Sequence, residues 1–167
     1  DNRMGLNLGE GAGFVALESE EAAKQRGAKV YSELRGYANT CDAYHQTASS
    51  PEGYGASNAM NKALESAGLT ADDIDYVNLH GTATKMNDLS EGNAIETVFG
   101  DQVPDVSSTK GFTGHTLGAA GGIEAVFSNL SISENMLFPN LNFTEQMEVL
   151  NFSPLSDVKE GAEVNNV

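Results

Sequence analysis

Two histidines stand in short loops rich in glycine and threonine. His80 is followed by Gly81-Thr82-Ala83-Thr84, and His115 closes a run that begins at Ser107. Loops that follow apolar runs commonly present side chains to a cleft. A neutral imidazole donates one N–H while a backbone group holds its other nitrogen, so two of them could stabilise negative charge on one oxygen. The pair indicates such a site, although a lone histidine is more often a core residue.

Two rival interpretations of these loops are weaker. Zinc needs three or four ligands, and the chain has no recognised spacing such as HExxH. Ser107 and Lys110 match S-x-x-K, a pattern in which serine and lysine share a helix turn. Gly111 and Gly114 disfavour a helix there, so Lys110 is expected in a loop with carboxylate partners. The candidate partners are Asp88, Glu91 and Glu124.

Cys41 and His45 would form a thiolate–imidazole pair if they shared one helix face. Their segment is polar and shows no helical pattern. A small buried thiol and a histidine at the edge of a site are therefore expected.

The run from Gly9 to Gly13 resembles a dinucleotide-binding fingerprint but fails twice. Its spacing is GxGxG, and it leads into the strand-like run Phe14 to Leu17 where the fingerprint needs a helix. The glycines are expected instead to let other backbone approach closely.

Composition indicates a folded chain and excludes several classes of function. The chain has 167 residues, 40% of them hydrophobic, and no apolar run long enough to span a membrane. Its single cysteine excludes a disulfide framework, and its net charge of −15 opposes binding to nucleic acid. No cofactor is indicated, and a cytoplasmic location is expected by default.

Helical and strand-like segments alternate, which predicts an α/β protein that folds as one unit, with helices layered against a sheet. Apolar residues recur at helical spacing from Leu117 to Leu130, which predicts a buried helix. The remaining expected elements are helices at 19–26, 54–67 and 88–99, a turn at 71–73, strands at 29–37, 74–79 and 103–108, and a loop-rich tail from residue 135.

Several motifs together resemble the C-terminal part of the β-ketoacyl-acyl-carrier-protein synthases, the elongating type II fatty-acid condensing enzymes. They are Arg3-x-Gly5 with Gly9-Glu10-Gly11-Ala12-Gly13, Cys41-Asp42-Ala43-Tyr44-His45, His80-Gly81-Thr82-x-Thr84 with Asp88-x-x-Glu91, and Ser108-x-Lys110-x-x-x-Gly114-His115. The resemblance implies a thiolase-like layered α/β fold made of two pseudo-symmetric halves. Residues 1–18 would end the first half, and residues 19–167 would form a second half that is truncated at its end.

The resemblance implies an acyltransferase of fatty acid biosynthesis that performs a decarboxylative Claisen condensation. A cysteine accepts an acyl chain, malonyl-acyl carrier protein loses carbon dioxide, and the resulting enolate attacks the acyl thioester. The implied partners are acyl carrier protein and malonyl and acyl thioesters, and the parent would be a homodimer.

Site roles follow from the same resemblance. His80, His115 and Lys110 would be catalytic. Asn78, Glu91 and Glu124 resemble the oxygen ligands of a monovalent cation found in some members. The residues that would support the site are Asp88, Glu91, Glu124, Thr82, Thr84 and His45.

Two departures from the family pattern bear on function. The nucleophilic cysteine of the family lies in the first half, and Cys41 matches a different position; the gating Gly-Phe-Gly-Gly turn expected after Val167 is also missing. The fragment alone is therefore expected to be inactive. The alternative is a non-catalytic subunit like the chain-length factors of polyketide and polyene synthases.

Carrier proteins are acidic and are usually bound by basic patches. In this acidic chain the local basic clusters are few, and Lys24, Arg26 and Lys29 form one of them.

Overall fold

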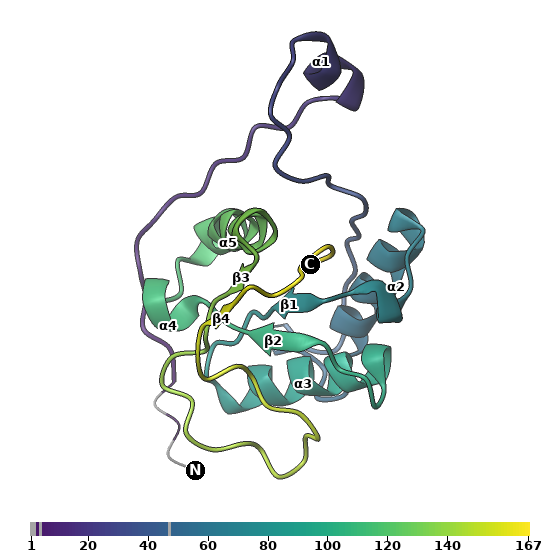
Figure 1. The fold of residues 1–167 in the computed structure, drawn as a ribbon. Helices are drawn as coiled ribbons and strands as arrows, with labels where there is room; N and C mark the ends of the chain where they lie inside the picture. The colour runs from purple at the N-terminus through teal and green to yellow at the C-terminus, as the bar shows by residue number, and fades with distance from the viewer. Residues whose placement is uncertain (1–2, 4, 47) are drawn as a thin grey trace.

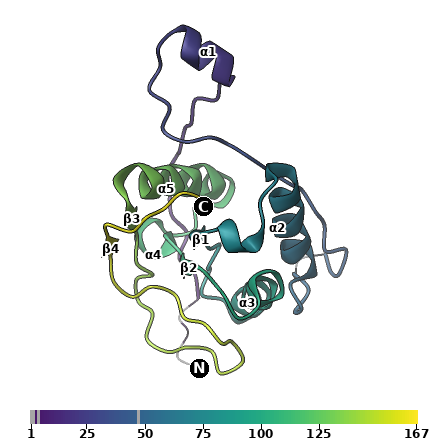
Figure 2. The ribbon, with the colours of Figure 1, turned by 45° about the vertical axis from the view of Figure 1, so that its right-hand side comes forward.

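The computed structural model describes residue 3, residues 5–46 and residues 48–167. Helices lie on both sides of a short central sheet (Figures 1 and 2). The helices are α1 (Glu20–Gln25), α2 (Tyr54–Ala67), α3 (Lys85–Phe99), α4 (Lys110–Thr113) and α5 (Ala120–Glu134), with 3-10 turns η1 (Ala71–Asp73) and η2 (Leu117–Ala119). The strands are β1 (Tyr76–Asn78), β2 (Asp105–Ser107), β3 (Met136–Leu137) and β4 (Lys159–Glu160).

The central sheet is a parallel pair. β1 and β2 are aligned with Val77 opposite Val106 and Asn78 opposite Ser107. Parallel strands need a crossover connection, and α3 provides it. Figures 1 and 2 show α2 and α3 on one side of this pair and α5 on the other. The predicted alternation of helix and strand is therefore confirmed.

The hydrophobic core contains residues of β1, β3 and the C-terminal tail. Tyr76 and Leu137 are fully buried and pack with Ala162 and Val164. The Tyr76 hydroxyl donates to Ser107 Oγ at 2.7 Å, and Ser107 donates to the Phe138 carbonyl at 2.6 Å. Burial raises the pKa of Tyr76, so this chain of hydrogen bonds holds a neutral phenol.

The tail from residue 135 is loop-rich, as predicted, apart from the short strands β3 and β4, which form a second sheet. β3 and β4 pair antiparallel, with Leu137 opposite Lys159. Two residues in each strand are too few to give a periodic pattern in the sequence.

Several predicted helices are confirmed. Ser19 caps α1 by accepting a hydrogen bond from Ala22 N–H at 3.2 Å. α2 ends at Gly68, which has φ +68°. Its alanine stripe packs closely, since a Cβ on Gly36 would lie 2.2 Å from the Ala63 oxygen. No helix in the described residues is both long and apolar enough to cross a bilayer.

The predicted strands at 14–17 and 29–37 are wrong as paired strands. Both segments run along an arm that carries α1 away from the rest of the molecule (Figure 1), and neither pairs with another strand among the described residues. Phe14 is 90% exposed and Tyr37 is 74% exposed. Apolar composition alone does not form a strand, because a strand also needs a hydrogen-bonding neighbour.

The helix predicted to be buried between Leu117 and Leu130 is also only partly correct. α5 is present, but only Ala120 and Ser131 are buried within it. Leu117 is 63% exposed and lies in η2, with φ +54°. The apolar residues of α5 therefore have one face open in this chain. The helix predicted at 88–99 begins three residues earlier, at Lys85.

Two glycines of the N-terminal arm pack closely against the backbone of α4 and α5. A Cβ on Gly9 would lie 2.0 Å from the Thr113 oxygen, and one on Gly13 would lie 2.4 Å from the Gly122 carbonyl. Close backbone approach, which the Gly9–Gly13 run predicted, is confirmed.

Replacing Gly13 by alanine should lower the free energy of unfolding by about 1–3 kcal/mol, because the new methyl group must displace the backbone of α5. Gly121→Ala, in α5 itself, is the matched control, because a Cβ on Gly121 would meet nothing within 4 Å. That control should raise stability by up to about 1 kcal/mol. Urea unfolding measures both effects, and an unchanged stability for Gly13→Ala would contradict the close contact.

Candidate active site

The loop that carries His80 is fixed by a carboxylate from α3. Leu79 N–H donates to the Ser107 oxygen at 2.8 Å and extends the β1–β2 pairing by one residue. Glu91 then accepts the backbone N–H groups of His80 at 2.6 Å and Gly81 at 2.8 Å. Both oxygens of Glu91 are thereby used to hold the loop.

Gly81 is required by the space around it. It has φ +48°, and a Cβ would lie 2.4 Å from Ser108 Cβ. Ser108 Oγ lies 3.3 Å from the His80 oxygen and 3.2 Å from the Gly81 oxygen, and it donates to this pair of carbonyls. The loop after β2 therefore supports the loop after β1 directly.

His115 is positioned by the N-terminal segment. Its backbone N–H donates to the Asn7 oxygen at 2.8 Å, and its carbonyl accepts from Gly9 N–H at 3.1 Å. Its Nδ1 accepts the Leu117 N–H at 3.2 Å. Since Nδ1 is an acceptor, the neutral ring carries its proton on Nε2 and can donate there.

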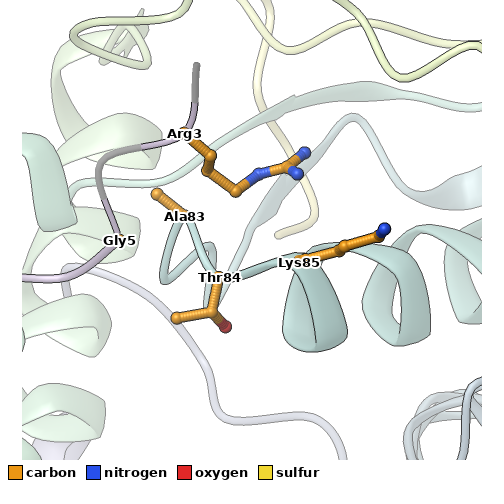
Figure 3. A pocket seen from close by; sticks show the side chains of 5 residues that line it. All are labelled: Arg3, Gly5, Ala83, Thr84 and Lys85. Carbon is orange, nitrogen blue, oxygen red and sulfur yellow. The ribbon is translucent and has the colours of Figure 1, made fainter. Parts of the chain in front are cut away.

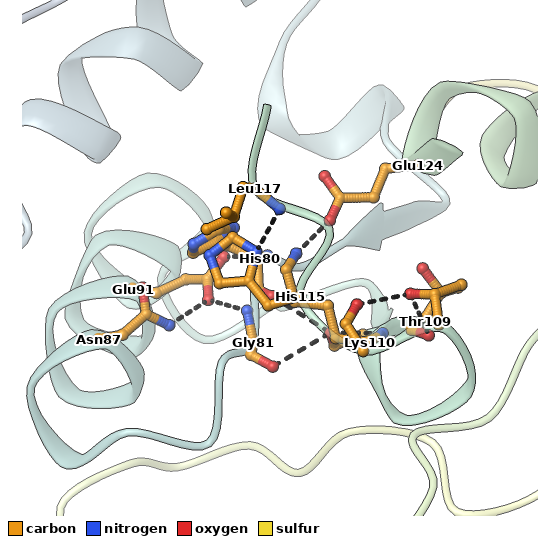
Figure 4. Close-up of polar contacts among 12 residues, drawn as sticks. His80, Gly81, Asn87, Glu91, Thr109, Lys110, His115, Leu117 and Glu124 are labelled. Atoms are coloured by element: carbon orange, nitrogen blue, oxygen red, sulfur yellow. Dashed lines mark hydrogen bonds and ion pairs between the residues drawn. The ribbon is translucent and has the colours of Figure 1, made fainter. Parts of the chain in front are cut away.

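The two imidazoles meet at the C-terminal edge of the β1–β2 pair. Their ring centroids are 5.1 Å apart, and the ring planes are at 87° (Figure 4). The structure therefore brings together the two histidines that the sequence singled out.

His80 has a pKa below its ordinary value. Desolvation is the main cause, and the positive charge of Lys110 is the second. The Glu124 carboxylate acts in the opposite direction. At neutral pH His80 is thus a neutral hydrogen-bonding group.

Lys110 is buried and paired. Its side chain is 6% exposed and its ammonium group forms an ion pair with Glu124 of α5 (Figure 4). Of the three predicted carboxylate candidates, Glu124 is the partner. A buried lysine without such a partner would carry a large desolvation cost.

The prediction that Lys110 lies in a loop is wrong, because it begins the one-turn helix α4. The S-x-x-K interpretation still fails. Ser107 belongs to β2 and is fully buried, with its hydroxyl bonded to Tyr76 and Phe138. Serine and lysine therefore do not share a helix turn.

The other carboxylates near the loops have separate partners. Asp88 forms an ion pair with Arg3, with 3.2 Å between Oδ2 and Nε. Burial raises the pKa of Glu91, although the amide hydrogen bonds from Gly81 and His80 oppose this shift. Asn87 also donates to Glu91, at 3.3 Å.

The two threonines contact each other at the start of α3. Thr82 Oγ1 and Thr84 Oγ1 are 2.9 Å apart. Thr82 is buried, and Thr84 is the N-cap residue of α3 but makes no side-chain capping bond.

The segment with Cys41 and His45 is not helical, so the two residues do not share a helix face. The prediction of a buried thiol is wrong, because Cys41 is exposed. His45 is exposed as well. The segment is anchored by Asp42, which accepts N–H bonds from Gly55 at 2.6 Å and Ser50 at 3.3 Å.

The predicted monovalent cation site remains a prediction. Asn78 has a buried carboxamide whose oxygen and nitrogen have no hydrogen-bond partner, which suits an oxygen ligand. Glu91 fits less well, since both of its oxygens accept backbone N–H groups. In the described part of the chain, no group of three or more His, Cys, Asp or Glu side chains is placed to hold a metal ion.

Sequence reasoning missed the residues that support the loops through backbone groups. Asn140 accepts the Ser108 N–H at 3.0 Å, and Asn7 and Leu117 hold His115. Asn7 and Leu117 act through backbone groups, which leave no residue type to recognise, and Asn140 contributes its side-chain oxygen from a loop 32 residues away in sequence.

Solved structures with the same arrangement define the class of fold. The ishigamide ketosynthase/chain length factor superposes with a TM-score of 0.90 at 38% identity, covering 98% of this chain and 40% of that one. The AntDE ketosynthase, solved with its acyl carrier protein AntF, gives 0.84 at 33% identity, covering 88% and 36%. The predicted thiolase-like α/β fold is therefore confirmed.

The family follows from the sequence match. Residues 31–144 match the model of the beta-ketoacyl synthase C-terminal domain, and the chain belongs to that family. It is 49% identical over 144 residues to 3-oxoacyl-[acyl-carrier-protein] synthase 2 of Staphylococcus aureus. The match covers 85% of this chain and 36% of the relative, so the chain spans little more than a third of it.

The pKa of His80 should respond to the charges of the ion pair with opposite signs. Lys110→Met removes a nearby positive charge and should raise the pKa, whereas Glu124→Gln should lower it further. Titration of the imidazole C–H signals by NMR measures both. Lys159→Met, which removes the partner of Asp105, is the control and should leave the His80 pKa unchanged.

The same shift affects stability. Since folding lowers the pKa of His80, the free energy of unfolding should fall as the pH drops from about 6.5 through the folded pKa.

For the variants of the ion pair, a rise in the His80 pKa in Glu124→Gln would contradict the assigned effect of the Glu124 charge.

Proposed function

We propose that this chain is the C-terminal portion of a 3-oxoacyl-acyl-carrier-protein synthase of fatty acid elongation. In this reaction malonyl-acyl carrier protein condenses with an enzyme-bound acyl chain and gives 3-oxoacyl-acyl carrier protein. The observation that carries the proposal is the pair of imidazoles whose ring centroids lie 5.1 Å apart, one with Nδ1 occupied by a backbone amide. The names of the relatives support the same reaction.

The chemistry needs a stabilised enolate. When malonyl thioester loses carbon dioxide, the electron pair of the broken C–C bond moves onto the thioester and places negative charge on its oxygen. His115 Nε2–H and a ring N–H of His80 donate hydrogen bonds to that oxygen in the proposal. Preorganised donors of this kind commonly contribute about 10²–10³ in rate.

The second step forms the new bond. The enolate carbon attacks the carbonyl of the enzyme-bound acyl thioester, and the cysteine thiolate leaves as the carbonyl re-forms. A neutral His80 suits this role, because a charged His80 could transfer its proton to the enolate carbon and end the reaction before condensation. The positive charge of Lys110 favours the neutral form of His80.

The nucleophilic cysteine is proposed to lie outside this chain. Cys41 is exposed and its segment is not helical, so the helix N-terminus that would activate a thiol is not provided there. The fragment is accordingly proposed to be inactive by itself.

Acyl carrier protein is the proposed partner, and the AntDE ketosynthase was solved with such a protein. The basic cluster around α1 offers an acidic carrier protein little net positive charge. Lys24 pairs with Glu20, and Arg26 pairs with Glu18. A carrier-docking surface is therefore proposed elsewhere on the full-length protein, which we propose is a cytoplasmic homodimer.

A non-catalytic subunit is the second candidate. It is favoured by the similarity to the ishigamide ketosynthase/chain length factor. The two candidates differ in whether carbon dioxide release depends on the histidines of this chain.

Replacing His80 or His115 by alanine in the full-length protein should lower the rate of carbon dioxide release from malonyl-acyl carrier protein by about 10²–10³. Release of labelled carbon dioxide measures this rate. Cys41→Ala is the control and should keep the acyl-enzyme and the release of carbon dioxide. Unchanged release in both histidine variants would exclude the catalytic role and favour the partner subunit.

A further inference from the structure

A cavity opens where the His80 loop runs into α3. Its volume is about 370 Å³, and it is lined by Arg3, Gly5, Ala83, Thr84 and Lys85 (Figure 3). Arg3 comes from the N-terminal segment, and Lys85 is the first residue of α3. Two cationic side chains thus line one cavity in a chain whose net charge is −15.

Lys85 differs from most basic residues of the chain. Six others form ion pairs with carboxylates, and Lys29 lies over the Tyr31 ring. Among the described residues only Lys85 and Lys62 have neither kind of partner. The positive charge of Lys85 is therefore not neutralised by a neighbouring carboxylate.

Arg3 and Asp88 form the adjoining wall. Their ion pair is partly buried, with side chains 21% and 23% exposed. Asp88 holds the guanidinium at the cavity and offsets part of its charge. Figure 3 shows the Arg3 guanidinium and the Lys85 amine on the same side of the start of α3, so Lys85 supplies the uncompensated charge.

The N-terminus of α3 contributes to the positive electrostatic potential at the cavity. Thr84 makes no side-chain capping bond, and its hydroxyl is engaged by Thr82 instead. The first amide groups of this 15-residue helix therefore receive no cap from Thr84, although Asp88 in the same first turn offsets part of their partial positive charge.

We propose that this cavity binds the phosphate group of the thioester substrate, with Lys85 as its main charged contact. The inference rests on the proposed function, in which the malonyl group is attached to a pantetheine arm that bears a phosphate. Ala83 and Thr84, which line the cavity, belong to the same loop that carries His80. A phosphate ester carried by a protein or by coenzyme A offers the same chemistry.

The decisive comparison uses two substrates that differ only in the phosphate. In the full-length protein, Lys85→Ala should lower the preference in kcat/KM for malonyl-phosphopantetheine over malonyl-pantetheine by about tenfold, through KM. The loss should shrink at high salt, because exposed charges are screened. Lys62→Ala, an exposed lysine on α2 without an ion pair, is the matched control and should keep the preference.

The outcomes separate this inference from the proposed function. An equal loss for both substrates would overturn the phosphate site. A loss with malonyl-acyl carrier protein but not with malonyl-phosphopantetheine would also overturn it, because Lys85 would then contact the carrier's surface. A matching loss with malonyl-coenzyme A would support the site and show that either source of phosphate is accepted.

Calorimetry tests the site even if the wild-type protein releases no carbon dioxide and the proposed function fails. Phosphopantetheine should then bind the wild-type protein about tenfold more tightly than pantetheine does, and Lys85→Ala should abolish that difference. Equal affinities for the two compounds in the wild-type protein would overturn the inference.

Discussion

The parallel pairing of β1 and β2 is the constraint on which the candidate site depends. Parallel strands end at the same edge of a sheet, so the loops that follow them must lie side by side. The His80 loop follows β1, and the segment from Ser108 through α4 to His115 follows β2. With Asn78 aligned to Ser107, the two loops begin at the same level. Ser108 then bridges them through the carbonyls of His80 and Gly81.

The charged groups are arranged around this edge so that each is compensated separately. Lys110 pairs with Glu124, Asp88 pairs with Arg3, and Glu91 is held by backbone amides. This division explains why one carboxylate could not replace another. The partner of Lys110 must come from α5, whereas the carboxylate that holds the His80 loop must come from α3.

The sequence predicted local features well where residue type determines backbone conformation. The paired loops were found because glycine and threonine mark them, and α2 was found from its alanine stripe and Gly68. Pairing was harder to predict, since the segments 14–17 and 29–37 have strand-like composition but no strand neighbour among the residues that the structure describes. The short strands β3 and β4 form because Ala162 and Val164 pack against Tyr76, far away in sequence.

The hydrogen bond between Leu117 N–H and His115 Nδ1 makes the proton position on that ring a property of the main chain. An amide does not titrate in the physiological range, so the tautomer does not depend on the ionisation of a neighbouring side chain. Leu117 itself is largely exposed and has φ +54°. The side chain at this position can therefore change without removing the donor, with glycine or asparagine easing the backbone, whereas a β-branched residue would strain it and proline would remove the N–H.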